Sequence, residues 1–191
     1  MGDRRLAFIA TAFFLLDLAG SASALSQPVN FADLEGYAVA ADVHREQLIR
    51  RDGKTFTVRI HQDWILHVND DHYIVMTLGT TVQTPNGPRK AKPNSGSFAL
   101  DEPLMLKSRG GGEAMFKFAD SVLMFMRTFP AGAYRTQFAF TRSGANLTCT
   151  VTEAFAREPG KELKMESAFG GEIMVLNSKQ LPSTCKVAKK Q

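Results

Sequence analysis

Apolar and polar residues alternate with a period of two through most of this chain, and this alternation constrains the fold more than any other feature. Between Thr55 and Asn69, the even positions are mostly apolar and the odd positions are mostly polar. Successive side chains of a β-strand point to opposite faces, so the pattern predicts a strand with one buried face. Because we also find no long amphipathic helical pattern, we expect an all-β protein.

Turn signals divide the alternating segments into strands. Asp52-Gly53, the strongest short-range signal for a hairpin, precedes the segment 55–69. That segment is longer than a usual strand, so we expect a break or bend near Gln62-Asp63. We interpret residues 122–126, which are apolar throughout, as a strand, with a helical segment as the alternative. A short helix is expected within residues 161–169.

Roughly eight to ten strands joined by tight turns predict an antiparallel all-β domain. We expect either a calycin-like up-and-down barrel or a β-sandwich. The sequence has no visible internal repeat and no visible domain boundary, so residues 25–191 are predicted to form one domain. A segment of that length can bury a full hydrophobic core.

The start of the chain, Met1–Ala24, has the features of a secretory signal peptide. Arg4 and Arg5 provide positive charge, Leu6–Leu16 is almost wholly apolar, and Ala22-Ser23-Ala24 is a small-residue cleavage site. The apolar run is shorter than the 20 or so residues that a spanning helix needs, so we expect no retained anchor. The mature protein is therefore predicted to be periplasmic or secreted, without a transmembrane segment.

The chain has two cysteines, Cys149 and Cys185, and both lie in the part predicted to be exported. An even number of cysteines in an oxidising compartment favours a disulfide. The pair lacks the C-x-x-C spacing of redox sites and the closely spaced ligands of a metal site. Cys149 also falls on the apolar positions of its segment. We therefore predict an inward-facing disulfide that ties the C-terminal strand to the domain.

A basic segment in the middle of the chain, Gln83–Ser97, contains three prolines, two glycines and three basic residues. Alternation is lost there, and we predict an exposed, mobile loop. This loop is the surface through which the chain would act as an envelope interaction protein or an inhibitor. The formal net charge of +4 is too small to predict a nucleic-acid partner. The sequence does not specify an oligomeric state.

Histidines and acids give no clear metal or catalytic pattern. His61, Asp63 and His67 share one face of a predicted strand. His61 and His67 would be about 20 Å apart along a straight strand, too far for one ion unless the strand bends or pairs with the strand of His72. We therefore interpret them as solvent-facing residues and assign no metal ligand and no cofactor.

Catalytic motifs are also not visible. The chain has no Gly-x-Ser-x-Gly and no dinucleotide fingerprint, and its acidic residues lie mostly at turns. We assign no catalytic residue and favour a non-enzymatic protein. A hydrolase whose site is assembled from distant residues is the least favoured alternative.

The interior of a small barrel is either filled by side chains or holds one small ligand. If it is open here, we expect a small apolar or amphipathic ligand. The candidate pocket residues are the aromatic residues Trp64, Tyr73, Phe116, Phe118, Tyr134 and Phe138.

Two resemblances support this class of protein. Leu34-Glu35-Gly36-Tyr37 resembles the Gly-x-Trp motif at the start of lipocalin-type barrels. The chain is also similar to small exported proteins of unknown function from alphaproteobacteria. The second resemblance rests on the signal peptide, Arg51-Asp52-Gly53, Gly132-Ala133-Tyr134-Arg135 and the two cysteines. It implies export and a β fold, and it implies no activity.

Overall fold

The computed structural model describes residues 27–69, 72–84, 86–105 and 112–189, so the predicted signal peptide lies outside the described residues. The elements in chain order are the 3-10 helix η1 (Phe31–Leu34) and the strands β1 (Tyr37–Arg51), β2 (Lys54–Val68), β3 (Tyr73–Thr84), β4 (Gly87–Lys90), β5 (Asn94–Ala99), β6 (Leu104–Met105), β7 (Glu113–Ala119), β8 (Val122–Phe129), β9 (Gly132–Ser143), β10 (Asn146–Arg157), β11 (Leu163–Glu166), β12 (Glu172–Gln180) and β13 (Thr184–Lys189). No α-helix occurs among the described residues, and the all-β prediction is confirmed.

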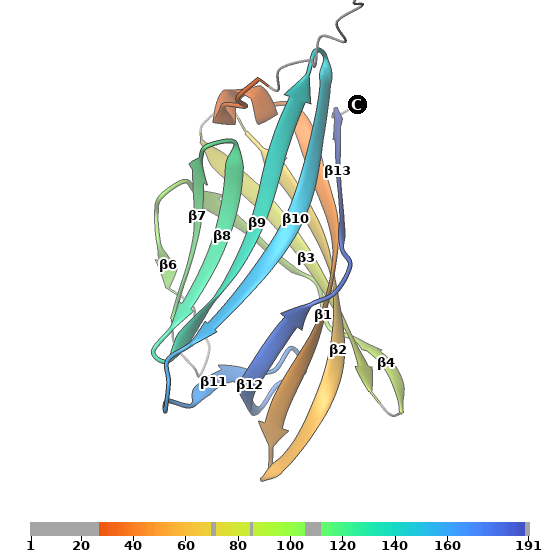
Figure 1. Cartoon of the computed structure of the whole chain (residues 1–191), viewed down its shortest axis with the longest axis vertical. Helices are drawn as coiled ribbons and strands as arrows, with labels where there is room; N and C mark the ends of the chain where they lie inside the picture. The colour runs from red at the N-terminus through yellow and green to blue at the C-terminus, as the bar shows by residue number, and fades with distance from the viewer. Residues whose placement is uncertain (1–26, 70–71, 85, 106–111, 190–191) are drawn as a thin grey trace, which may run out of the picture.

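The strands form two antiparallel sheets that face each other (Figure 1). The larger sheet has the order β11-β12-β1-β2-β3-β4, with β13 also paired to β1 and β5 to β3. The smaller sheet has the order β10-β9-β8-β7-β6. Between β5 and β7, backbone pairing is limited to an isolated bridge between Leu100 and Phe116. The sheets are therefore not closed into a barrel, which fits the β-sandwich alternative.

At the edge formed by β10 of the smaller sheet, a disulfide and a glutamine side chain join the two sheets. Cys149 of β10 forms a disulfide with Cys185 of β13, with Cα atoms 5.4 Å apart, as predicted. Nearby, the Gln180 side chain accepts a hydrogen bond from Glu153 N at 2.7 Å and donates one to Val151 O at 3.1 Å. These bonds satisfy backbone groups of β10 that a closed barrel would pair with another strand. The disulfide fits an extracellular or periplasmic protein.

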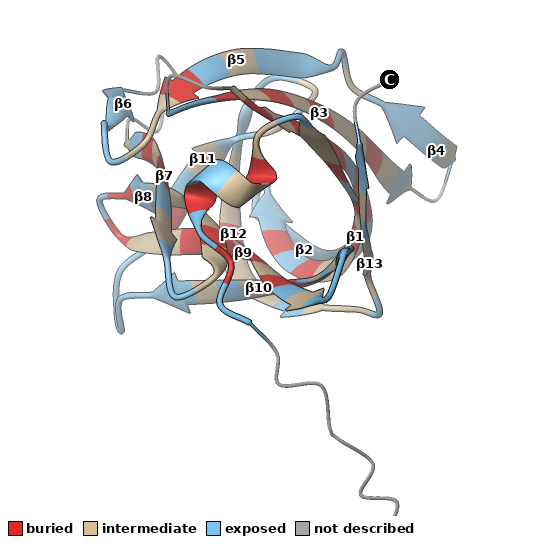
Figure 2. Ribbon diagram, turned by 90° about the horizontal axis from the view of Figure 1, so that it is seen from above, coloured by how far each residue is buried: buried red, intermediate tan, exposed pale blue. Residues whose placement is uncertain are grey.

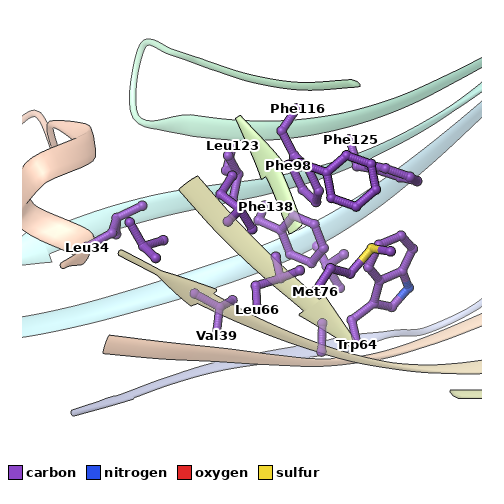
Figure 3. Close-up of a cluster of buried hydrophobic side chains, with 14 of the residues drawn as sticks. Leu34, Val39, Trp64, Leu66, Met76, Phe98, Phe116, Leu123, Phe125 and Phe138 are labelled. Carbon is purple, nitrogen blue, oxygen red and sulfur yellow. The ribbon is translucent and has the colours of Figure 1, made fainter. Parts of the chain in front are cut away.

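An aromatic core fills the end of the interior that carries η1. Trp64 of β2 packs edge-on against Phe125 and Phe138 of the smaller sheet, with ring centroids 5.3 and 5.7 Å apart (Figure 3). The helix η1 lies across this end of the molecule and buries Phe31 and Leu34 (Figure 2). This half of the interior is therefore filled by side chains.

The hairpin prediction at Asp52-Gly53 is confirmed. For the next strand we expected a break or bend near Gln62-Asp63, and the structure contradicts the break. Asp52 and Gly53 have φ angles of 50° and 73°, the positive values that a type I′ turn requires. Strand β2 then runs without a break from Lys54 to Val68, through Gln62 and Asp63. Its pairing with β1 and β3 is continuous in register, so hydrogen bonds on both sides hold the long strand together.

The segment predicted as a loop, Gln83–Ser97, instead contains β4 and most of β5. Both strands pair with β3, where Lys90 lies opposite Thr81 and Asn94 lies opposite Leu78. Lys90 and Asn94 are four positions apart, whereas their partners Thr81 and Leu78 on β3 are three positions apart. The extra residue between β4 and β5 therefore has the geometry of a one-residue β-bulge. Prolines and glycines hide the alternation in the sequence, but β3 still provides pairing partners on both sides of the bulge.

The region after β10 also differs from its prediction. Residues 161–169 contain the strand β11 and not a short helix. Leu163 lies opposite Val175 of β12, and both side chains are fully buried. Tertiary pairing with β12 therefore overrides the local sequence signal. The interpretation of residues 122–126 as a strand is confirmed by β8.

Candidate functional site

A cavity of about 480 Å³ lies inside the larger sheet, toward the end opposite η1. Its walls come from β1, β2 and β3, from β4 and the bulge after it, from β8, and from the β11–β12 hairpin. The same alternation supplies both core and cavity: on β2, Trp64 and Leu66 enter the core, whereas Val58 and Ile60 line the cavity. The volume lies within the range of small-molecule sites.

The cavity combines apolar walls with basic side chains. Its apolar lining includes Ile49, Val58, Ile60, Leu78, Met165 and Ile173. The charged lining residues among the described part of the chain are Arg45, Arg51, Arg89, Lys92, Arg127 and Glu166. Five of these six are basic, so the cavity has a positive lining that favours anions.

Arg127 is the basic residue that the smaller sheet contributes to this cavity. It shares the inward positions of β8 with Leu123, Phe125 and Phe129. Within the described residues, no carboxylate forms an ion pair with Arg127, and its guanidinium lies 5.3 Å from the centroid of the Phe129 ring. Burial, and then the positive charge of Arg45, lower the pKa of Arg127. A bound anion would offset both effects.

A buried polar network separates the cavity from the aromatic core. Arg45 Nη1 forms an ion pair with Glu153 Oε1 at 2.9 Å and donates a hydrogen bond to Gln62 Oε1 at 2.8 Å. Gln47 Nε2 donates to the Tyr134 hydroxyl at 2.7 Å. Burial raises the pKa of Tyr134 to about 12, so the phenol stays neutral. The charge of Arg45 is thus compensated by Glu153, whereas Arg127 has no such partner in the part of the chain that the structure describes.

The β11–β12 hairpin contacts β4 at the cavity. The Arg89 guanidinium lies 4.5 Å from the centroid of the Phe169 ring, a cation–π distance. Both residues line the cavity. This contact links two segments that are distant in sequence and places another basic group beside an apolar surface.

The aromatic residues predicted to form a pocket lie outside the lining of this cavity. Trp64, Phe116 and Phe138 are buried in the aromatic core (Figure 3), and Phe118 packs partly buried against it. Tyr134 belongs to the polar network and to a second apolar cluster. Tyr73 is exposed. The structure brings the three core residues together as packing, and the ligand role assigned to the six stays a prediction.

Arg45, Gln47, Arg127 and Glu153 were not predicted from the sequence as site residues. Each of them occupies an inward position of a strand whose other inward residues are mostly apolar. A polar residue that interrupts an apolar face was the available signal. Glu153 has no recognisable partner in the sequence, because Arg45 lies on the facing sheet and is 108 positions away.

No family model, no curated protein and no solved structure matches this chain. The lipocalin-type and alphaproteobacterial resemblances therefore stay predictions. Within the described residues, no helix has the length and apolar character needed to cross a membrane.

Proposed function

We propose that this protein binds an anionic amphiphile, with long-chain fatty acids as the representative class, and that it acts as an exported binding protein. The observation that carries the proposal is a cavity of about 480 Å³ that combines apolar walls with Arg127, which has no ion-pair partner within the described residues. The hydrocarbon chain would lie against the apolar inward positions of β1, β2 and β3. Its burial would supply affinity in proportion to the area removed from water.

Arg127 is the group that we assign to the anionic head. A guanidinium can bind a carboxylate through two parallel hydrogen bonds, and such charge-assisted bonds are stronger than neutral ones. Arg45 lies near enough to affect the pKa of Arg127, and its Nε is buried without a hydrogen-bond partner among the described residues. Arg45 is therefore the second donor in this proposal.

The alternative of a partner protein bound at residues 83–97 has weaker support. Arg89 and Lys92, two of the three basic residues of this segment, line the cavity and so already have a place in the ligand site. The segment also belongs largely to strands that pair with β3. We therefore favour the small ligand over the envelope partner.

Calorimetric titration of delipidated protein with three ligands of equal chain length tests the proposal: palmitate, hexadecanol and hexadecylamine. We expect palmitate to bind most tightly and hexadecylamine most weakly. Arg127→Met should weaken palmitate binding by about 10- to 100-fold, the equivalent of a charged hydrogen bond, and should change hexadecanol binding little.

Arg59→Met is the matched control, because Arg59 is 71% exposed and does not line the cavity. It should leave the affinity for palmitate unchanged. Failure of palmitate to bind, or equal losses of affinity in Arg127→Met and Arg59→Met, would contradict the proposal.

A further inference from the structure

The outer face of the larger sheet carries a cluster of two histidines and two aspartates, on the side opposite the cavity. In the antiparallel register of β1 and β2, Asp42 lies opposite Asp63 and His44 lies opposite His61. Residues two apart on a strand share a face, and opposite residues on paired strands are neighbours. The register alone therefore gathers all four side chains into one patch.

The donor atoms of three of these residues converge. Asp42 Oδ1 lies 2.6 Å from His61 Nε2 and 2.9 Å from His44 Nε2. The ligand atoms of Asp42, His44 and His61 all lie within 4.8 Å of one another. In a tetrahedral zinc site, metal–ligand bonds of about 2.0–2.2 Å place donor atoms roughly 3.3 Å apart. The observed spacing therefore suits a shared ion after small side-chain rotations.

The ligand atoms of Asp42 and His61 lie at the centre of the patch. Asp42 Oδ1 and His61 Nε2 have almost no exposed surface, yet neither makes a hydrogen bond to any described residue. Their separation of 2.6 Å is within ion-pair distance. Two potential ligand atoms thus face each other at the centre of the patch.

We propose that Asp42, His44 and His61 bind a divalent first-row transition-metal ion, with Zn²⁺ as the reference ion. Imidazole nitrogen and carboxylate oxygen are the ligands that such ions take when no cysteine is present. Asp63 Oδ1, 3.1 Å from His61 Nε2, is the nearest further carboxylate for a fourth position. The side chains of the three primary ligands are 31–48% exposed, so the cluster lies at the solvent-facing surface of the sheet.

The proposed site differs from the metal site that was considered, and not assigned, from the sequence. That pattern joined His61, Asp63 and His67 along a single strand, over a distance that one ion cannot span. In the structure, Asp42 and His44 come from the paired strand, and His67 lies opposite Ala38, away from the cluster. His61 faces solvent as predicted, with its side chain 31% exposed, and the proposed site adds a shared ion to this face.

The test is calorimetric titration of the untagged, chelator-treated protein with Zn²⁺. We expect one ion per chain, and we expect His44→Gln and His61→Gln each to weaken binding at least tenfold. Asp42→Asn should also weaken it. The imidazole NMR signals of His44 and His61 should shift during the titration, whereas those of His67 and His72 should not.

His67→Gln is the matched control, because it removes a histidine from the outer face of the same strand. It should keep the affinity of the unaltered protein. The proposal is overturned if the unaltered protein does not bind Zn²⁺, or if His44→Gln, His61→Gln and His67→Gln bind it equally well. Circular dichroism of each variant establishes that it is folded before these affinities are compared.

Discussion

Glu153 and Arg45 meet inside the molecule, where their side chains are only 7% and 12% exposed. Removing one partner of a buried ion pair leaves the other charge without compensation, which costs far more than the pair itself contributes. Thr136 Oγ1 also donates to Glu153 Oε1 at 3.2 Å, so the carboxylate is held by more than one group. The stability of the polar network therefore depends strongly on this single acid.

Glu153→Gln should lower the free energy of unfolding by about 3–5 kcal/mol, because it leaves the Arg45 charge buried and unpaired. Urea denaturation followed by circular dichroism measures the change. The control is Glu46→Gln, since Glu46 pairs with Arg59 on the surface and should lose less than about 1 kcal/mol. Equal effects of the two substitutions would contradict the importance assigned to burial.

Tyr134 makes the stability depend on pH in the alkaline range. Burial raises its pKa from 10.0 to about 12 in the folded protein. Between these values the unfolded chain binds fewer protons than the folded protein, so stability should fall as the pH rises from 10 to 12. The fall attributable to Tyr134 is about 2–3 kcal/mol.

Urea denaturation at several pH values measures this loss in the unaltered protein and in Tyr134→Phe. The variant loses the hydroxyl that titrates, so its stability should fall less steeply over the same range. A variant with the same pH dependence as the unaltered protein would show that Tyr134 ionises normally in the folded state.

At the scale of elements, the disulfide and Gln180 hold the edge of β10 against β12 and β13. The disulfide closes a loop between positions 36 apart, which in the chain-entropy description corresponds to roughly 3–4 kcal/mol. The double variant Cys149→Ser/Cys185→Ser should lose about this much stability. Because the bond joins the two sheets, its removal should also increase amide exchange in β13 more than in β2.

Chemical denaturation of the double variant and of the reduced unaltered protein gives two independent measurements of the disulfide. The two measured losses of stability should agree, since the double variant and the reduced protein lack the same disulfide. Labelling of the unreduced, unfolded protein with a thiol reagent is the check on the pairing itself. Detection of two reactive thiols would refute the disulfide.

Strands with clean alternation could be predicted from the sequence, and strands formed by pairing alone could not. The inward residues of β2 were recognised because Val58, Ile60, Trp64 and Leu66 alternate with mostly polar residues. In β4 and β11, each of four residues, the local pattern is too short to be distinctive. These strands exist because β3 and β12 provide hydrogen-bonding partners, a non-local effect that propensity does not contain.

At the scale of the whole molecule, the larger of the two apolar clusters spans both sheets. Trp64 belongs to the larger sheet, and its aromatic neighbours Phe125 and Phe138 belong to the smaller one. Neither sheet can separate from the other without exposing this cluster. We therefore expect the sheets to unfold together in a single cooperative transition.

Trp64 is the only tryptophan of the chain, so its fluorescence reports on the interface between the sheets. Urea transitions followed by tryptophan fluorescence and by far-ultraviolet circular dichroism should coincide within error. A fluorescence transition at clearly lower urea would mean that the sheets separate before their strands unfold, contrary to this expectation.

The period-two alternation determined the fold class by itself, because strand geometry sends successive side chains to opposite faces whatever the partner strand. It also indicated an inward position for Cys149. The tertiary structure decided which strands pair and where the filled interior gives way to a cavity. It also brought Arg45 to Glu153 and Asp42 to His61. Such contacts depend on register and sheet facing, which are set by the packing of distant segments and not by local sequence.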